Sequence, residues 1–512
     1  MKKTVLAQHA AKACETRTGL SARLALGIGA ALLAGCAAGP DYVRPAAPAT
    51  QRYTAEPLAA QTVASAVNGG AAQHYVEGQA VEAQWWTVFG SDALNQLVQA
   101  ALAANPDLQA ADAALRAARE SAAAQRGGFY PGVDLSLNPT RQQVAEPLAS
   151  PTASGTNLYT LHTAQLSVAY TPDVFGGVCR QVEAADAQAD VARFQREAAR
   201  LTLASNLVVA AIGEASLSAQ LNATNELVEM ARKQLDAVRK QQHAGMVGAA
   251  DVAAQEAALA QVEATVPPLE KQLAQQRDLL AVLTGRLPSE ALSQRPAFDS
   301  LKLAETLPLT VPAKLVEQRP DVRAAEAQLH GASAQIGVAQ AARLPNIALT
   351  ATLGSSALTT GTLFKSGTGF WSIGADLVQP IFKGGTLMHQ QRAAEALYDQ
   401  AAAQYRSVVL TAFQNVADAL HAIDADARAL QTALAAEQAA HKSLTIAQRQ
   451  WQLGAVAYPA VLQAQQAYQQ AVIALIQARA MRYSDTVALF QALGGGWDSG
   501  ACTACRKAAA QP

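Results

Sequence analysis

Two short stretches decide the fold of this chain: Thr171-Pro-Asp-Val-Phe-Gly-Gly177 and Gln379-Pro-Ile-Phe-Lys-Gly-Gly385. In each, a segment of alternating apolar and polar residues stops at a proline and two glycines, which is typical of a break between a strand and a helix. About 67 residues without proline follow each break, at 178–244 and 386–453. At 1.5 Å rise per residue, these runs predict two helices about 100 Å long. The strand-to-helix turns are therefore predicted at Gly176, Gly177, Gly384 and Gly385.

The two stretches belong to two copies of one unit. Residues 106–135 align without gaps on 320–349, and residues 245–285 align on 454–494. Each copy is predicted to contain a helix, a strand, a polar loop, a second strand, a very long helix, a turn and another helix. A repeat that covers nearly all of the chain after residue 100 predicts one integrated body instead of several separate domains.

The other segments are arranged around these copies. The predicted boundaries are a signal peptide at 1–35, a lipidated N-terminal tether at 36–84, a first repeat at 85–285, a connector at 286–317, a second repeat at 318–497 and a C-terminal tail at 498–512. The connector contains several prolines and shows no clear period. It is expected to pack as a belt around the outside of the molecule.

The amino terminus has the pattern of an export signal. Several lysines and arginines precede an apolar run, Leu24 to Gly35, which is too short to span a bilayer. The run ends in Leu33-Ala-Gly-Cys36, which resembles the lipobox of bacterial lipoproteins. Cleavage there would leave Cys36 as a lipidated first residue, and Ala37 after it implies sorting to the outer membrane. The alternative is an ordinary signal peptide with a chance cysteine.

The other cysteines do not form a metal-binding pattern. Cys179 lies at the start of a long helix and is expected to pack as a small apolar residue. Cys502-Thr-Ala-Cys505 is a lone CxxC motif, without a second pair or a nearby histidine. A disulfide or two idle thiols are therefore favoured over zinc.

Composition argues against several classes of function. A net charge of −1 provides no field that would collect nucleic acid. Only 15% of residues are charged, below the usual share of about 25%, and the abundant alanine and glutamine favour long, closely packed helices. The sequence has no HExxH, Walker or G-x-S-x-G motif. We therefore expect no enzyme activity, no cofactor and no metal.

A series of short motifs carries a family resemblance. In chain order they are Trp85-Trp86, Asn105-Pro-Asp-Leu108, the first turn, Gln318-Arg-Pro-Asp321, the second turn and Leu493-Gly-Gly-Gly-Trp497. Their order, over about residues 36 to 497, resembles the outer-membrane efflux protein family in its lipoprotein branch of TolC-like, OprM-like and NodT-like channels. The resemblance implies a lipid-anchored homotrimer in the outer membrane. It also implies a passive exit duct for drugs or other small toxic compounds, driven by an inner-membrane pump of the RND type through a periplasmic adaptor.

Four segments of about 10 residues alternate strictly, around 133–137, 165–171, 347–353 and 371–377. One apolar face and one polar face are the signature of a membrane β-barrel. Because open edges are not tolerated in lipid, four strands require further chains. Three chains give 12 strands, which the resemblance also implies, with the loops 141–160 and 354–369 outside the cell. No later run of 18 apolar residues is expected to span a membrane as a helix.

The helices are predicted to form the wall of a tube. Val252, Leu259, Val266, Leu273 and Leu280 recur every seven residues, which is a coiled-coil seam; a helical bundle with a solid core is the alternative. Helices at about 103–126 and 249–284 together span about 90 Å, nearly the length of one long helix. Pro267-Pro268 should kink or end the second of them. The fold class is therefore a mixed membrane α/β protein, a trimeric duct with a 12-stranded transmembrane barrel that continues into a long periplasmic α-helical barrel.

The turns after the two long helices lie farthest from the strands and are expected to form the periplasmic tip. By resemblance, the adaptor docks there, at Gly245, Met246, Val247, Gly248, Gly454, Ala455 and Val456. Family members often carry a Leu-Asp-Ala-Gln-Arg run just past the second turn, which helps to hold the gate shut. This chain has Leu462-Gln-Ala-Gln-Gln466 there, without the charged latch. We expect hydrogen bonding by Gln463 and Gln466 and steric constriction by Tyr458 to form the gate; ordinary helix-surface amides are the alternative.

Two rival functions remain at this point. A duct for secreted polypeptides, as in type I secretion, would use the same architecture, but the lipobox favours small-molecule efflux. A periplasmic coiled-coil adaptor would have a single helical hairpin and no alternating strands, whereas this sequence has two hairpins and four strands. The sequence does not identify the cargo, the adaptor, the pump or the gating mechanism.

Overall fold

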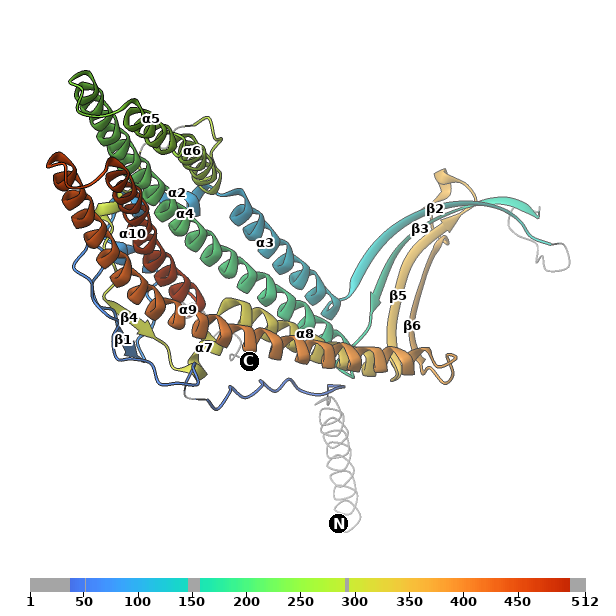
Figure 1. The fold of residues 1–512 in the computed structure, drawn as a ribbon. Helices are drawn as coiled ribbons and strands as arrows, with labels where there is room; N and C mark the ends of the chain where they lie inside the picture. Colours follow the sequence, from blue (N-terminus) through green and yellow to red (C-terminus); the bar gives the residue numbers. More distant parts are fainter. Residues whose placement is uncertain (1–36, 51, 146–156, 291–293, 498–512) are drawn as a thin grey trace, which may run out of the picture. The chain divides into compact units, whose positions relative to one another are not determined.

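The computed structural model describes residues 37–50, 52–145, 157–290 and 294–497 (Figure 1). The chain divides into two compact units, which we call the sheet unit and the hairpin unit. The sheet unit comprises Met1–Arg44, Arg116–Asp190 and Glu326–Ala403, and the hairpin unit comprises Pro45–Leu115, Val191–Ala325 and Gln404–Pro512. Cys36, Cys502 and Cys505 lie outside the described residues, as does part of the first predicted external loop.

The two halves of the chain have a similar order of elements, except that the first ends in two helices, α5 and α6, where the second has one, α10. The first half runs α3 (Pro106–Arg126), β2 (Gly132–Gln143), β3 (Leu158–Tyr170), α4 (Gly177–His243), α5 (Ala249–Glu263) and α6 (Val266–Leu283). The second half runs α8 (Pro320–Ala341), β5 (Asn346–Ala357), β6 (Gly369–Val378), α9 (Thr386–Gln452) and α10 (Tyr458–Ala492). Both α4 and α9 contain 67 residues, so the two long helices begin and end within one residue of the predicted limits.

The helix predicted at about 103–126 begins at Pro106 in the structure, and a separate helix precedes it. α2 (Asp92–Ala104) ends before Asn105, whose backbone is extended, and α3 begins at Pro106. A proline disfavours the helical conformation of the residue before it, and this explains the break. Asn105 Oδ1 then accepts hydrogen bonds from the N–H groups of Asp107 (2.9 Å) and Leu108 (3.2 Å), which caps α3.

The second short helix is also interrupted, as its prolines predict. α5 ends at Glu263 and α6 begins at Val266, directly before Pro267 and Pro268. Proline has no N–H and is tolerated in the first turn of a helix, so the pair starts α6 instead of bending it. The heptad residues Val252, Leu273 and Leu280 are buried, which confirms the seam.

The sheet unit contains a four-stranded antiparallel sheet in the order β2-β3-β5-β6. Its register places apolar residues in rows on one face, such as Leu135–Leu166–Leu353–Trp371 and Val133–Val168–Ala351–Ile373. The opposite face carries polar rows, such as Asp134–Ser167–Thr352–Ser372. The apolar face is open: Leu135 is 74% exposed and Trp371 is 73% exposed. Strands of this kind cannot bury their apolar side within one chain.

The core of the hairpin unit explains the tryptophan motif near residue 85. Trp85 stacks on Phe490, with ring centroids 5.5 Å apart, and Phe89 and Phe298 both contact the ring of Tyr483. Trp85, Phe89 and Tyr483 are essentially inaccessible to solvent. These aromatic residues join residues 85–89, the predicted connector and α10 into one core. Buried aromatic pairs contribute more than their area alone.

The tether and the connector contain more regular structure than expected. β1 (His74–Glu77), within the predicted tether, pairs in parallel with β4 (Thr306–Leu309), within the predicted connector. The connector also contains the short helix α7 (Pro312–Gln318). Strands of four residues are too short to show a period, and their pairing joins segments more than 200 residues apart.

α4 is more apolar than expected, and the expectation for Cys179 was wrong. α4 contains an 18-residue window with a mean hydropathy of 1.4, which is apolar enough to cross a membrane. However, 61% of that window is buried, so packing against the core accounts for its composition. Cys179 is exposed and does not pack as a core residue. It lies in the first turn of α4, where its N–H donates to Asp173 Oδ2 (2.7 Å).

Candidate functional site

The two helical hairpins of the hairpin unit end in equivalent turns. Gly245 (φ +75°) and Gly454 (φ +74°) adopt the left-handed conformation that favours glycine. In the first turn the N–H of Met246 donates to Gln241 O (2.9 Å), and in the second the N–H of Ala455 donates to Gln450 O (2.8 Å). Together with the bonds made by the two glycine N–H groups, these are Schellman motifs, which satisfy the last carbonyls of α4 and α9.

The turns present small and apolar groups to solvent. Met246 is 72% exposed, and Leu453, just before the second turn, is 84% exposed. A Cβ atom added at Gly245 or Gly454 would meet nothing within 4 Å. Val247 in the first turn and Val456 in the second are both half-buried. The predicted docking residues therefore lie at two accessible hairpin ends of nearly identical backbone shape.

A small apolar core lies directly beneath these turns. Its buried members come from α4, α5, α9 and α10: Leu235, Val238, Val252, Leu444, Tyr458, Val461 and Ala464. The partly buried Val247 packs against this core from the first turn. The core holds the ends of the two hairpins together, so buried apolar side chains pack directly beneath the exposed turns.

Tyr458 belongs to this core and is only 3% exposed. Its hydroxyl donates a hydrogen bond to Gln255 Oε1, and Gln255 Nε2 donates to Ala231 O (3.1 Å). Burial of the phenol raises the pKa of Tyr458 above its usual range. A ring enclosed in this way is at odds with the predicted steric constriction by Tyr458.

Gln463 and Gln466, the other two predicted gate residues, are exposed on α10. Gln466 Nε2 donates to Gln261 Oε1 on α5 (3.1 Å), so one of them joins the two hairpins through a pair of amides. Gln255 and Gln261 were not predicted as site residues. The available signal was the heptad: Gln255 occupies the seam position that Val262 and Leu269 fill in later heptads.

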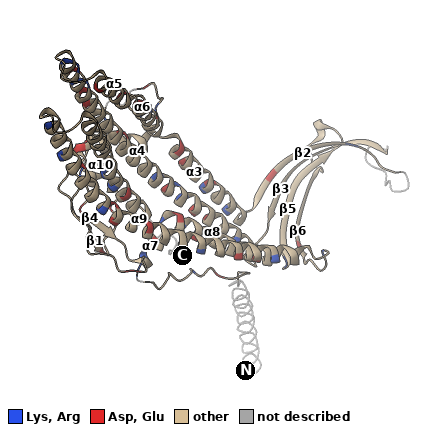
Figure 2. Ribbon diagram, in the orientation of Figure 1, with Lys and Arg blue, Asp and Glu red and all other residues tan. Residues whose placement is uncertain are grey.

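The two hairpin ends differ in charge. On the first, Arg239 pairs with Glu256 (2.7 Å) and Arg232 pairs with Glu263 (2.8 Å), across α4 and α5. The second has Arg449 in the last turn of α9 and no charged residue from 450 to 478. Figure 2 shows the remaining charges scattered along the helices. Strands β3 and β5 carry none.

The predicted strand-to-helix turns also lie where helices begin. Gly176 (φ +74°), Gly384 (φ +58°) and Gly385 (φ +84°) adopt the left-handed conformation, whereas Gly177 is the first residue of α4. Asp173 caps α4 by accepting from the N–H groups of Val178 (3.0 Å) and Cys179 (2.7 Å). No equivalent carboxylate precedes α9, where residues 380–383 are Pro-Ile-Phe-Lys.

Within the described residues, no group of three or more His, Cys, Asp or Glu side chains could hold a metal ion. What the chain provides is an amphipathic antiparallel sheet with an exposed apolar face and two long helical hairpins with accessible ends. These features define an outer-membrane channel protein.

The chain belongs to the outer membrane efflux protein family, whose model matches residues 97–286 and 311–495. It is 32% identical over 426 residues to the pyoverdine export outer membrane protein OpmQ of Pseudomonas aeruginosa, covering 81% of this chain and 88% of the relative. It is 30% identical over 475 residues to the toluene efflux pump outer membrane protein TtgC of Pseudomonas putida, covering 93% and 95%.

The structure is also similar to solved channels. The outer-membrane channel OprN superposes with a TM-score of 0.81 at 27% sequence identity, over 90% of this chain and all of that one. The resemblance expected from the sequence motifs is therefore confirmed. The protein is an outer-membrane efflux channel component, located in the outer membrane and extending into the periplasm.

Proposed function

We propose that three copies of this chain form one duct that carries small toxic compounds out of the periplasm. The observation that carries the proposal is the sheet. Among the described strands, β2 and β6 each have one free edge, and one face of the sheet is apolar and exposed. Three such sheets, joined edge to edge, close a 12-stranded barrel with its apolar face toward lipid, which leaves no free edge in the membrane.

The helices supply the periplasmic part of this duct. Each half of the chain provides one 67-residue helix and several shorter ones. The shorter helices are α3, α5 and α6 in the first half and α8 and α10 in the second. This parallel organisation supports an internal sequence repeat, and three chains would line a helical tube with such repeats. The connector, residues 286–317, forms a belt outside that tube.

The proposed anchor is a lipid on Cys36, with residues 1–35 removed as a signal peptide. Energy comes from an inner-membrane pump of the RND type, because the sequence has no nucleotide-binding motif. A periplasmic adaptor meets the accessible hairpin ends at Gly245–Gly248 and Gly454–Val456. Gln463 and Gln466 form an uncharged gate, in which Gln466 is held by its hydrogen bond to Gln261 on α5.

Relatives with different named cargoes support small molecules as the transported class. One is named for pyoverdine export and another for toluene efflux, and these compounds share little except small size. A duct of this kind is not the selective element, so selection of the cargo belongs to the pump. Export of a secreted polypeptide through the same architecture is the second candidate.

Site-specific photo-crosslinking in cells tests the docking and the class of transport together. A photoreactive residue is placed at Val247 or Val456, and the captured partner is identified by mass spectrometry. We expect capture of the adaptor of a proton-driven drug pump. Capture of the adaptor of an ATP-driven protein exporter would shift the function to secretion, and no periplasmic partner at either position would contradict the docking site.

The oligomer is tested separately. Purified protein in mild detergent is expected to have the mass of three chains and to resist dissociation by dilution. A monomer with an exposed sheet would contradict the barrel. As a control, Trp371→Asp places a charge on the proposed lipid face and should reduce the yield of inserted trimer. Ser372→Asp, on the opposite face, should not.

A further inference from the structure

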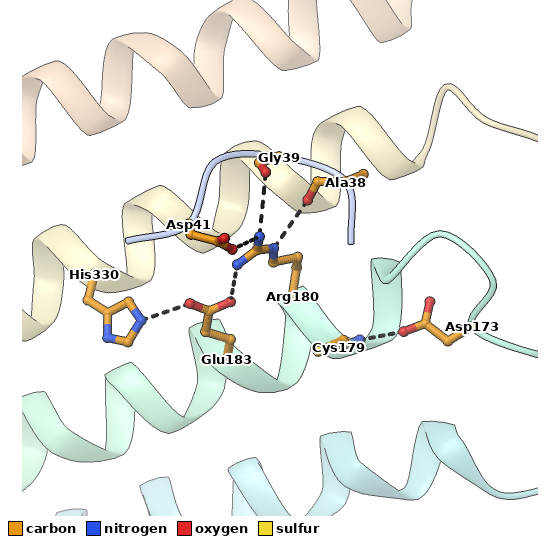
Figure 3. Close-up of polar contacts among 8 residues, drawn as sticks. All are labelled: Ala38, Gly39, Asp41, Asp173, Cys179, Arg180, Glu183 and His330. Carbon is orange, nitrogen blue, oxygen red and sulfur yellow. Dashed lines mark hydrogen bonds and ion pairs between the residues drawn. The ribbon is translucent and has the colours of Figure 1, made fainter. Parts of the chain in front are cut away.

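The first described residues of the chain are bound to helices of the sheet unit. Residues 37–44 lie along α4 and α8 in the sheet unit, and Figure 3 shows Arg180 directed at Ala38, Gly39 and Asp41. Arg180 Nε donates to Ala38 O (3.1 Å), and its two terminal nitrogens pair with Asp41 (2.7 Å) and Glu183 (2.7 Å). In return, the N–H of Ala38 donates to Phe175 O (2.9 Å). The segment is therefore bound through its backbone and through one charge.

The segment follows a single face of α8 in the antiparallel sense. Gly39 lies at Gly337, Tyr42 stacks on His330 with ring centroids 4.4 Å apart, and Arg44 pairs with Glu326 (3.0 Å). Residues 326, 330 and 337 are spaced by four and seven, which places them on one side of a helix. Eleven helical residues and five extended residues both span about 17 Å, so the two lengths match without slack.

Close backbone approach fixes the register of this contact. A Cβ atom added at Gly39 would lie 2.4 Å from Gly337 Cα, and one added at Gly337 would lie 2.6 Å from Ala38 O. A Cβ atom added at Gly176 would lie 2.8 Å from Ala37 Cα. Only glycine fits at these three positions, because a real Cβ does not approach so closely. The amino-terminal end of the segment is thereby placed against the strand-to-helix turn that precedes α4.

The guanidinium is buried, although the carboxylate that it binds is not. The side chain of Arg180 is 6% exposed, whereas that of Asp41 is 93% exposed. A buried guanidinium needs partners for its donors, and here they are the tether backbone, Asp41 and Glu183. Glu183 is held in turn by His330 Nε2 (2.8 Å). Two of these partners belong to the segment, so Arg180 is satisfied only when the segment is bound.

We propose that Arg180, Glu183, His330 and Gly337 form a seat for the mature amino terminus, with Arg180 as its positioning residue. The seat holds Ala37 at the turn Thr171–Gly177, so that a group carried by the preceding residue is delivered to the membrane end of the sheet unit. The part of this inference that concerns an acyl chain rests on the proposed lipidation of Cys36. The seat itself rests on residues 37–44 and does not require the lipid.

The test uses the full-length protein in lipid nanodiscs, with a photoreactive benzoylphenylalanine at Ala37 and hydrogen exchange of residues 37–44. In the wild-type background, the probe is expected to crosslink within residues 171–180. Arg180→Ala should abolish this crosslink and speed exchange about tenfold or more, since it removes several charge-assisted hydrogen bonds. Arg126→Ala is the matched control, because Arg126 makes an exposed ion pair with Asp186 (2.9 Å) and does not contact the segment in the structure.

Two further variants keep the test decisive if Arg180→Ala folds poorly. Asp41→Ala changes an exposed side chain and should speed exchange by a smaller factor. Arg180→Lys should give an intermediate effect, because an ammonium cannot reproduce the fork that reaches backbone and carboxylates together. Exchange and crosslinking that are unchanged in all three variants would overturn the seat.

The mass of the amino-terminal peptide separates failure of the seat from failure of the lipid anchor. An acylated Cys36 together with exchange that depends on Arg180 supports both. An unmodified amino terminus with the same dependence on Arg180 supports the seat and overturns the delivery of an acyl chain. An acylated terminus with exchange independent of Arg180 overturns the seat and leaves the proposed lipoprotein intact.

Discussion

The two hairpin ends share a backbone but differ in the side chains that hold them. Both long helices end in Schellman motifs at Gly245 and Gly454, which occupy equivalent places 209 residues apart. The first end is joined by Arg–Glu pairs across α4 and α5. The second is joined to its neighbours by Tyr458 bonding to buried Gln255 and by the amide pair Gln466–Gln261.

This difference shows that the backbone of the turn and the side chains around it have separate requirements. Ending a helix in this way needs only a glycine at the left-handed position and an apolar base beneath it. The side chains around that turn are free to change, so one hairpin end can carry ion pairs and the other amides and aromatic rings. In the proposed trimer, a second end without such ion pairs would form a gate that is less sensitive to salt than the first end.

The largest effect is expected for Tyr458→Ala. The ring is 3% exposed and packs beside Trp451, with centroids 5.0 Å apart. Truncation of a buried aromatic side chain costs about 3–5 kcal/mol. The local free energy of opening at residues 450–465, measured by hydrogen exchange, should fall by that amount.

The equivalent position in the first hairpin gives the control. Ala249 is exposed at the start of α5, so Ala249→Tyr should leave the exchange of residues 241–256 almost unchanged. Equal destabilisation by the two substitutions would mean that the hairpin ends are not packed differently. No effect of Tyr458→Ala would contradict the core beneath the turns.

A smaller effect is expected when only the hydrogen bond is removed. Tyr458→Phe retains the ring but leaves Gln255 Oε1 without its donor at a fully buried position. An unsatisfied buried acceptor costs about 1–3 kcal/mol. Hydrogen exchange in α5 around residue 255 reports this loss. Tyr468→Phe, on the same helix but only half-buried, is the control and should change exchange little.

How much of this could be predicted from the sequence depends on the range of each signal. The long helices, the four strands and the glycine turns follow from periods and breaks that lie within about 70 residues. The helix expected from about residue 103 begins at Pro106, three residues later. The pairing of β1 with β4 was missed, because it joins two four-residue strands far apart in the chain.

The same argument applies to the site. The tip residues were found because glycines interrupt a long helical pattern. The steric role of Tyr458 was inferred from its position after the turn, but burial decides what a side chain can do, and burial depends on α5. Gln255 is visible in the sequence as a polar residue in an apolar seam. Its two partners, Tyr458 and Ala231, are on other helices and could not be identified from that pattern.

The turn glycines should respond equally at both hairpin ends. Gly245→Ala and Gly454→Ala each place a Cβ on a left-handed residue, at a cost of about 1–2 kcal/mol. Gly248→Ala is the control, because Gly248 has φ −87°, which alanine adopts without strain. Local unfolding of each hairpin end by hydrogen exchange measures the three variants. A loss at only one of the two glycines would mean that the turns are not equivalent.

The smallest effect, and the one that most directly separates the two ends, is the response to salt. Arg239 and Glu256 are about half exposed, so their ion pair contributes only about 0.2–1 kcal/mol and is screened as ionic strength rises. Arg239→Ala should therefore destabilise the first end at low salt and have no effect at high salt. The second end has no charged residue from 450 to 478, and its nearest charge is Arg449 in the last turn of α9, so its exchange should depend on salt less than that of the first end and should not respond to Arg239→Ala. An equal salt dependence at both ends would contradict this difference between them.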